Sequence, residues 1–214
     1  MLIAVSSAKG GVGKTTTAIH LAAYMSQFAP TLLIDGDAIR ASTRWAQRGN
    51  GKQLPFKVVD EKQTAKYARE YVNGHIVIDT EANPSDVDFR QVADGCDLLV
   101  IPAVPETTAT DGLIYTLAML QGIGHDRFKV LITKVPPRPR MDGVYLRESL
   151  VEQSIPVFAS EIPQLVAFDR ASEQGVPVYE VKEERAIRAW ESYSAAGKEI
   201  YVQSRQVRRT RRNS

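Results

Sequence analysis

The sequence predicts an α/β fold, in which a doubly wound and mostly parallel β-sheet is flanked by helices. Short runs of apolar and β-branched residues alternate along the chain with longer segments of helical periodicity, an order typical of βαβ units. Most of these runs are continuously apolar, as expected for strands that are covered on both faces. The chain of 214 residues has the length of one globular domain.

Seven segments are predicted as strands because each is a short apolar or β-branched run. The helical segments between them imply βαβ units and therefore parallel pairing. The predicted strands are residues 2–6, 31–35, 56–59, 75–79, 97–101, 129–133 and 156–159.

Five segments are predicted as helices because their apolar residues recur at spacings of three or four. Asp142 is expected to be the N-cap of the fourth segment. Gly197 lies inside the last pattern and weakens the expectation of an unbroken helix there. The predicted helices are residues 14–28, 42–48, 110–120, 142–153 and 183–203.

The composition favours a cytoplasmic protein. The single cysteine, Cys96, excludes an internal disulfide framework, and we expect it to be a small buried residue beside the strand at 97–101. The N-terminus lacks a basic segment followed by a long apolar stretch, and no window approaches ~20 consecutive apolar residues. We therefore expect neither a signal peptide nor a membrane-spanning helix. The three histidines are not spaced as metal ligands.

The formal net charge of +2 conceals an asymmetry. Five arginines and no acid lie in residues 205–214, so the remainder of the chain is mildly acidic. We therefore expect one domain at residues 1–204 and a basic, disordered tail at residues 205–214. The arginines of the tail are Arg205, Arg208, Arg209, Arg211 and Arg212.

The most specific motif, AKGGVGKTT at residues 8–16, follows the first predicted strand. A strand that leads through a glycine-rich turn into a helix lets backbone N–H groups converge on phosphate oxygens. The Lys14 ammonium is expected to reach the β- and γ-phosphates of ATP, and the Thr15 hydroxyl to coordinate Mg²⁺. A glycine turn that binds nothing is the alternative. The residues expected to bind the nucleotide here are Lys9, Gly10, Gly11, Val12, Gly13, Lys14, Thr15 and Thr16.

The motif has alanine, Ala8, where the ordinary phosphate-binding loop has glycine, and it carries a second lysine, Lys9. In this it resembles the deviant Walker A box, KGGxGK[ST], of the ParA/MinD family of ATPases, and the resemblance covers nearly the whole chain. It implies that Lys9 crosses to the nucleotide of a partner subunit in an ATP-dependent homodimer. Electrostatics agree, because two phosphate tails cannot face each other closely without cations between them. A solvated loop lysine is the alternative.

The second predicted strand ends in the motif DGD, which contains Asp35 and Asp37 and resembles the switch I segment D-x-D-P-Q of the family. The resemblance implies that Asp37 orients the attacking water and that Asp35 belongs to the outer shell of Mg²⁺. Acids at the carboxyl end of a strand beside a phosphate site suit both roles. Capping of the helix at 42–48 is the alternative for either residue. The chain departs from the family pattern at residues 38–40, where Ala38 replaces the usual proline.

The fourth predicted strand ends at Asp79 after a run of apolar residues, which is the Walker B arrangement. A buried carboxylate at the end of a strand needs a partner, and Mg²⁺ bound through water is the natural one. The family motif D-T-P-P becomes DTEA at residues 79–82, so the backbone of switch II is expected to differ from that of the family.

Two further segments resemble the family. Residues 102–111 match a P-x-x-P…D loop that enters a helix, and residues 131–140 occupy the place where relatives frame the adenine. Lys134 is the residue that we expect to contact the purine. A plain surface loop is the alternative.

The tail separates two kinds of family member. MinD-like members carry a C-terminal amphipathic helix that lies on the membrane, and such a helix needs a broad apolar face. Beyond Val202 the tail has only Val207 as an apolar anchor, so we expect no membrane binding. Arginine without an apolar stripe suits the phosphate backbone of DNA, and ParA-like members bind nucleoid DNA non-specifically as ATP dimers. A solubilising tail is the alternative.

The resemblance implies a slow ATPase that acts as a switch, with Lys9, Lys14 and Asp37 as its catalytic residues and with ATP and Mg²⁺ as cofactors. The DGD and DTEA motifs are most similar to the carboxysome-positioning (McdA) group, which implies a nucleoid-associated protein and an McdB-like adaptor that stimulates hydrolysis. Plasmid or chromosome partition with a ParB-like adaptor is the alternative within the family. A metabolic enzyme similar to dethiobiotin synthetase is the alternative outside it. An iron–sulfur role would need paired cysteines, and the chain has only Cys96.

Overall fold

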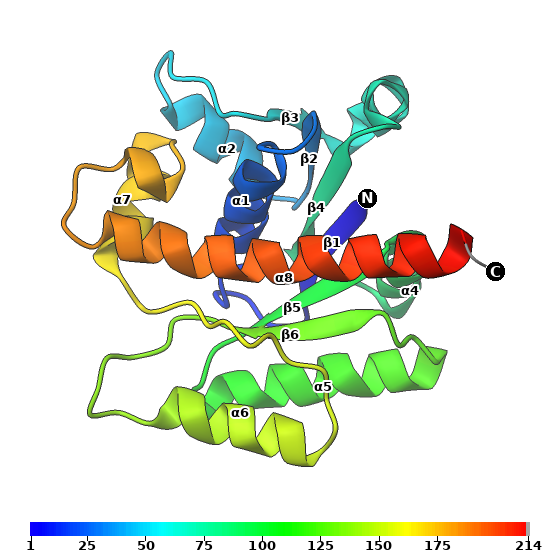
Figure 1. Cartoon of the computed structure of the whole chain (residues 1–214), viewed down its shortest axis with the longest axis vertical. Coiled ribbons are helices and arrows are strands. Elements are labelled where there is room, and N and C mark those ends of the chain that lie inside the picture. The colour runs from blue at the N-terminus through cyan, green and yellow to red at the C-terminus, as the bar shows by residue number, and fades with distance from the viewer. Residues whose placement is uncertain (213–214) are drawn as a thin grey trace.

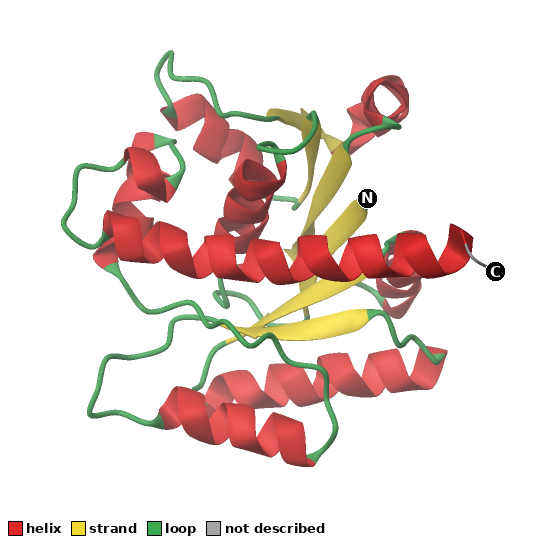
Figure 2. Ribbon diagram, viewed as in Figure 1, coloured by secondary structure: helices red, strands yellow, loops and turns green. Residues whose placement is uncertain are grey.

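The computed structural model describes the backbone of residues 1–212 and the side chains of residues 1–106 and 110–202. Its centre is a six-stranded sheet in the order β3-β2-β4-β1-β5-β6, in which all neighbouring strands run parallel (Figures 1 and 2). The predicted α/β class is therefore confirmed. The strands are β1 (Leu2–Ser7), β2 (Thr31–Gly36), β3 (Lys57–Asp60), β4 (His75–Ala82), β5 (Leu98–Ala103) and β6 (Phe128–Ile132).

The seventh predicted strand, residues 156–159, is wrong. This segment lies beside β6 but makes only an isolated bridge, between Val157 and Val130. The N–H groups of residues 159 and 160 donate to the carboxylate of Glu199 at 3.0 and 2.9 Å, so they are directed at a helix and not at β6. Pairing with the sheet cannot continue because these donors are already used.

Helices cover both faces of the sheet (Figure 1), which confirms the doubly wound arrangement. The helices α1, α2, α7 and α8 pack on one face, and α4, α5 and α6 pack on the other. A short helix, α3 (Thr64–Tyr67), and two 3₁₀ turns (Glu61–Gln63 and Ala68–Tyr71) lie near the β3 edge, and a third 3₁₀ turn (Val178–Glu180) precedes α8. The long helices are α1 (Lys14–Met25), α2 (Ala41–Arg48), α4 (Asp86–Gly95), α5 (Thr107–Ile123), α6 (Asp142–Glu152), α7 (Val166–Gln174) and α8 (Ala186–Arg212).

The five predicted helices are all present as α1, α2, α5, α6 and α8, with shifted ends. The prediction for Asp142 is wrong: it is the first residue of α6, Met141 is the N-cap, and the Asp142 carboxylate pairs with Arg140 at 2.9 Å. Helices α4 and α7 were not predicted. Each buries only two side chains, so neither has enough apolar residues to give a clear helical period.

The hydrophobic core consists of two layers, one on each side of the sheet. Helix α1 lies in the middle of the first layer, where α8 covers it (Figure 1). All but three of the twelve residues of α1 are buried, which fixes the start of the helix, and the loop before it, relative to the sheet. The loops at the carboxyl ends of the strands are therefore held on a rigid frame.

Helix α8 is unbroken at Gly197, contrary to the doubt that the sequence raised. A Cβ atom at Gly197 would collide with the ring of Tyr24 on α1. The glycine therefore allows two helices to approach closely, and the packing compensates for its poor helix propensity. The helix continues to Arg212, so the boundary expected at residue 205 does not coincide with the end of a helix. The side chains of the five predicted DNA-binding arginines lie outside the described residues. No helix in the described part of the chain is both long and apolar enough to cross a membrane.

Candidate nucleotide-binding site

A cleft of about 1030 Å³ lies at the carboxyl ends of the strands, where ligands bind in open α/β sheets. Its walls come from the loops that follow β1, β2 and β6, from the end of β4, and from two segments much later in the chain. The cleft is thus lined both by the predicted phosphate loop and by later segments that were not predicted from the sequence to belong to the site. Its lining residues are Gly10, Gly11, Gly13, Lys14, Thr15, Thr16, Asp37, Ala38, Ile39, Ala41, Glu81, Ala82, Thr133, Lys134, Pro137, Ile162, Pro163, Gln164, Leu165, Val166, Phe168, Asp169 and Tyr193.

The loop between β1 and α1 has the geometry of a phosphate cradle. Gly11 and Gly13 have φ angles of 78° and 89°, which side chains rarely tolerate. The Thr133 hydroxyl at the end of β6 donates to the Val12 carbonyl at 2.8 Å and so ties the loop to the sheet. Around Gly10 and Gly11 there is open space where a side chain would stand. Backbone N–H groups at a helix N-terminus can therefore face a phosphate in this cleft.

Lys14 begins α1 and points back over the loop. Its ammonium donates to the Lys9 carbonyl at 3.1 Å, and only 7% of the residue is exposed. Burial lowers the pKa of Lys14, while the carboxylates of Asp79 and Asp37 oppose that shift. The site therefore places a buried cation beside two acids at the position predicted for the β- and γ-phosphates.

Asp79 lies in the second half of β4 and is fully buried. One of its carboxylate oxygens accepts from the Ser42 hydroxyl at 2.8 Å, and the other has no hydrogen-bond partner among the described residues. Burial raises the pKa of Asp79 to about 7; the nearby hydroxyls of Ser42 and Thr15 oppose this shift, and the charges of Asp35 and Asp37 raise the pKa further. A buried carboxylate with an orphan oxygen beside a threonine hydroxyl is a set of donors that fits Mg²⁺.

The acids do not form a complete metal cage. No group of three or more His, Cys, Asp or Glu side chains capable of holding a metal ion is found within the described part of the chain. Mg²⁺ keeps several waters and is usually bound through one or two protein groups together with substrate phosphates. The donors that are present therefore fit a metal ion that arrives with a nucleotide.

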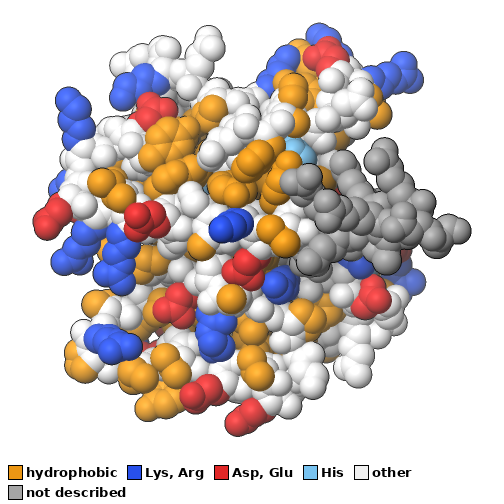
Figure 3. All heavy atoms as spheres, viewed as in Figure 1, with side chains coloured by type: hydrophobic (Ala, Val, Ile, Leu, Met, Phe, Trp, Pro, Cys, Tyr) orange, Lys and Arg blue, Asp and Glu red, His pale blue; other side chains and the backbone are white. Residues whose placement is uncertain are grey.

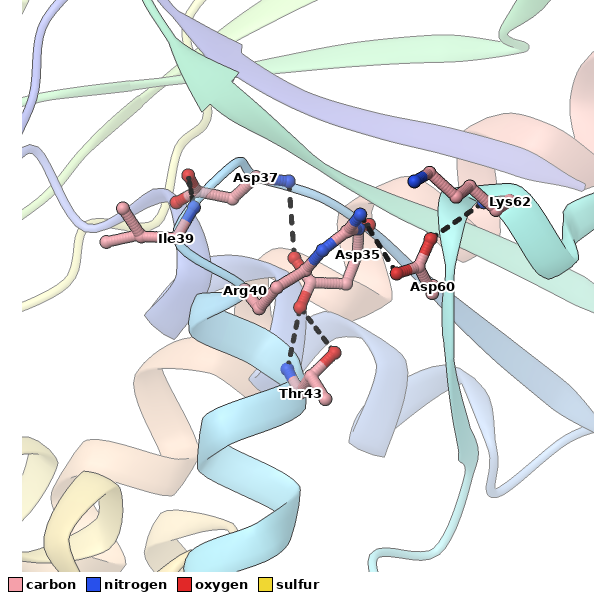
Figure 4. A network of polar contacts seen from close by, with 7 residues as sticks. All are labelled: Asp35, Asp37, Ile39, Arg40, Thr43, Asp60 and Lys62. Carbon is pink, nitrogen blue, oxygen red and sulfur yellow. Dashed lines mark hydrogen bonds and ion pairs between the residues drawn. The ribbon is translucent and has the colours of Figure 1, made fainter.

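Asp35 is engaged in a different way from the one predicted (Figure 4). One carboxylate oxygen accepts from the backbone N–H of Thr43 at 2.8 Å and from its hydroxyl at 2.6 Å. The other oxygen accepts from the N–H of Asp37 at 3.2 Å. Asp35 thus satisfies a donor in the first turn of α2, as in the capping alternative that the sequence left open. It does not line the cleft in this arrangement.

The rest of switch I is held by Arg40, one of the residues at which the chain departs from the family motif (Figure 4). Arg40 has a φ angle of 56° and donates to the carbonyl of Asp35 at 2.8 Å. It also forms an ion pair with Asp60 at the end of β3, at 2.9 Å. Asp37 lines the cleft, and one of its oxygens accepts from the N–H of Ile39 at 3.1 Å.

Lys9 does not line the cleft of a single chain. Its side chain packs against helix α5, where a Cβ atom on Gly112 would lie 2.8 Å from the Cβ atom of Lys9. It is partly exposed. The two lysines of the motif therefore lie in different places, because Lys14 faces the cleft and Lys9 faces α5.

Comparison with known proteins agrees with this geometry. Residues 3–178 match the model of the CobQ/CobB/MinD/ParA nucleotide binding domain. The chain belongs to this family. It is 32% identical over 206 residues to maintenance of carboxysome distribution protein A of Gloeobacter kilaueensis, and the match covers 93% of each chain.

Two solved structures show the same fold. A chain of the MinC:MinD cell division protein complex of Aquifex aeolicus has a TM-score of 0.73 at 15% identity, over 94% of this chain and 95% of the other. The Cyanothece McdA(D38A)-ATP complex has a TM-score of 0.65 at 18% identity, over 92% and 96%. The match to the family model confirms the ParA/MinD resemblance that the motifs indicated.

In this ParA/MinD family member, one wall of the cleft was missed by the sequence analysis. Most of residues 162–169, which enter α7, and Tyr193 on α8 line the cleft, and the start of this segment is hydrogen-bonded beside the chain that carries Thr133 and Lys134. Lys134 itself is exposed and has a φ angle of 51°. Apolar and aromatic side chains dominate this wall, which suits the flat face of a base. No motif marks these residues, so only their position in the fold could have identified them.

Buried polar contacts join α1, behind the phosphate loop, to Val178 and to α8. The ring of His20 accepts from the N–H of Val178 at 3.1 Å and contacts the Thr16 carbonyl at 2.6 Å. It also stacks on Tyr193 at 4.8 Å, whose hydroxyl bonds with that of Thr17 at 3.0 Å. Because one ring nitrogen must accept and the other must donate, these contacts require a neutral imidazole.

His20 should make the stability of the protein fall at acidic pH. Burial lowers the pKa of His20 to about 4, against about 6.5 in an unfolded chain. Between these two values the unfolded state binds the extra proton, so the free energy of unfolding decreases as the pH falls, by about 3 kcal/mol in total. Chemical denaturation at several pH values, compared between the unmodified chain and His20→Gln, measures the effect.

The variant removes the titrating group, so its free energy of unfolding should decrease less between pH 6.5 and pH 4. The comparison uses this slope and not the absolute stability, because His20→Gln also loses buried contacts. Equal slopes for the two chains would contradict the prediction.

Proposed function

We propose that this chain is a Mg²⁺-dependent ATPase that dimerises with ATP, binds nucleoid DNA and distributes carboxysomes in the cytoplasm. The observation that carries the proposal is the 32% identity to a carboxysome distribution protein over 93% of both chains. The cleft adds the chemistry, because it combines a phosphate cradle with a buried lysine, and the buried carboxylate of Asp79 near Lys14 has an orphan oxygen.

The residues of the cleft divide into roles for the phosphate end of ATP. The backbone of residues 10–16 and the ammonium of Lys14 bind the β- and γ-phosphates. Thr15 and, through water, Asp79 hold Mg²⁺, which supplies positive charge to the phosphate oxygens when bound. Asp37 orients the attacking water from the switch I loop. Asp35 joins the outer shell of the metal only if switch I moves, because both of its oxygens are engaged.

The base of ATP is assigned to the other end of the cleft. Lys134 and most of the wall formed by residues 162–168 line the same cleft. Stacking of the base on apolar side chains needs no specific hydrogen bonds, and Lys134 is assigned as the polar contact of the purine. The proposed purine contacts follow from this division of the cleft into a charged end and an apolar end.

Dimerisation is assigned to Lys9. Two nucleotides facing each other across a dimer bring two highly charged phosphate tails together, and a cation supplied by each partner offsets that repulsion. In a single chain Lys9 lies against α5 and does not line the cleft, so the proposed role is exerted on the nucleotide of the partner subunit.

DNA binding is assigned to Arg205, Arg208, Arg209, Arg211 and Arg212. The face crossed by α8 presents Lys and Arg side chains interspersed with Asp and Glu (Figure 3), so its described part offers no uniform basic surface. The tail differs, because it carries arginines without acids. A dimer presents two tails, which strengthens binding by avidity and makes DNA affinity depend on ATP. An adaptor that stimulates hydrolysis would release the complex.

A salt titration of DNA binding, with and without ATP, tests this assignment. Non-specific affinity should need ATP and should fall with salt at a log–log slope of about −0.9 for each phosphate contact. Changing Arg208, Arg209, Arg211 and Arg212 to alanine should weaken binding to any sequence at least about tenfold and flatten the slope. Alanine keeps the helical propensity of this end of α8.

A matched control removes the same charge from the β3 side of the molecule, with the exposed residues Lys52, Lys62, Lys66 and Arg69 changed to alanine. This variant should keep its DNA affinity. Unchanged DNA affinity in the tail variant, or an equal loss of DNA affinity in the control, would contradict the assignment of DNA binding to the tail. Tight binding to anionic liposomes would favour a membrane role instead.

A further inference from the structure

Four carboxylates surround the phosphate end of the cleft, and three of them are engaged. Both oxygens of Asp35 hold switch I and α2. Asp79 accepts from Ser42 and is buried beside Thr15. Asp37 accepts from the N–H of Ile39. The fourth carboxylate, that of Glu81, lines the cleft and is partly exposed, and the described residues include no hydrogen bond or ion pair to it.

The backbone of β4 holds Glu81 in this position. Val5 of β1 pairs with Asp79, but Ser7 pairs with Ala82, so β4 carries one more residue than β1 between these pairs. Such a bulge redirects a side chain and is common beside active sites. The residue before Glu81 is fixed, because the buried Thr80 hydroxyl donates to the Val5 carbonyl at 3.0 Å. Glu81 therefore projects into the cleft from a strand and not from a loose loop.

We propose that Glu81 is the general base of ATP hydrolysis, which deepens the ATPase function proposed above and rests on it. Its carboxylate takes a proton from the attacking water while the water oxygen forms a bond to the γ-phosphorus. The bond between the γ-phosphorus and the β–γ bridging oxygen breaks in the same step, and ADP leaves with that electron pair. Asp37 orients the water, and Lys14 stabilises the charge on the phosphate oxygens.

A general base at Glu81 contributes to the rate of ATP hydrolysis but not to the affinity for ATP. A carboxylate that faces a tri-anionic phosphate repels it, so Glu81 does not contribute to the affinity for ATP. A residue that held the phosphate or the metal ion would instead increase that affinity. The two possibilities are therefore separated when affinity and rate are measured on the same variant.

The test is single-turnover hydrolysis of Mg²⁺-ATP together with calorimetric affinity, for the unmodified chain, Glu81→Gln and Glu81→Asp. Glu81→Gln should hydrolyse ATP about 100-fold more slowly, with an affinity for ATP that is unchanged or higher. Glu81→Asp keeps a carboxylate and should be faster than Glu81→Gln. The retained affinity also shows that both variants are folded.

The control is Glu191→Gln, which removes the same charge from an exposed position on α8, and its rate should equal that of the unmodified chain. A Glu81→Gln rate equal to that of the unmodified chain would overturn the proposal. So would equal rates for Glu81→Gln and Glu81→Asp, or weaker ATP binding by Glu81→Gln. If the unmodified chain bound ATP but did not hydrolyse it, the ATPase function itself would be refuted.

Discussion

Replacing Lys14 by alanine is expected to weaken ATP binding at least about 100-fold, because the β- and γ-phosphates lose a buried cation whose removal typically costs 3–5 kcal/mol. In the structure the Lys14 ammonium lies over the phosphate loop, against the Lys9 carbonyl, and is almost fully buried. Water therefore cannot replace its charge. Isothermal titration calorimetry with ATP and Mg²⁺ measures the loss.

The control is Lys134→Ala, which removes an exposed lysine from the lining of the same cleft. We expect its effect on affinity to be less than about tenfold, because an exposed contact contributes little. If Lys14→Ala kept its affinity for the nucleotide, the assignment of the phosphate loop would be wrong.

Lys9→Ala is expected to bind ATP within one subunit but to lose the ATP-dependent dimer. Each dimer would lack two cations between facing phosphates, so its dissociation constant should rise by about 100-fold or more. The side chain of Lys9 also packs on Gly112 of α5. The variant Lys9→Met keeps the aliphatic stem that makes this contact and removes only the charge, so it should show the same loss.

Multi-angle light scattering with ATP and Mg²⁺ gives the mass of each variant, and calorimetry confirms that it still binds the nucleotide. Lys52→Ala, which removes an exposed lysine outside the nucleotide cleft, should dimerise as the unmodified chain does. If Lys9→Met formed the dimer as fully as the unmodified chain, the role of the Lys9 charge in the interface would be contradicted. The assignment of Lys14 would not be affected.

The phosphate end of the cleft could be predicted from the sequence because its chemistry is local. A strand, a glycine turn and a helix place residues 10–16 together whatever the rest of the fold does. Asp37 was predicted in the same way, from the end of the neighbouring strand. All of these residues except the buried Val12 line the cleft, as their positions in the motifs indicated.

Contacts between distant segments could not be predicted in this way. Asp35 was assigned to a metal shell, but in the fold it meets Thr43 of α2. The segment at 156–159 was predicted as a strand from its own residues. The carboxylate of Glu199, about forty residues later, takes the donors that would have continued the pairing. Thr43 is only eight residues from Asp35, and the sequence had left this capping role open as the alternative. Glu199 is distant along the chain, and a local pattern does not report such a partner.

The sequence by itself determined the α/β class, the family and the glycine turn that lines the cleft, because apolar periodicity and the glycine turn are properties of short segments. Only the tertiary structure decided what completes the site. It brought residues 162–169 and Tyr193 to the apolar end of the cleft, and the bulge in β4 directed Glu81 into the charged end. The reason is physical: strand register and helix packing are set by the whole core, so the direction of a side chain at a strand end is fixed only when the neighbouring strand is in place.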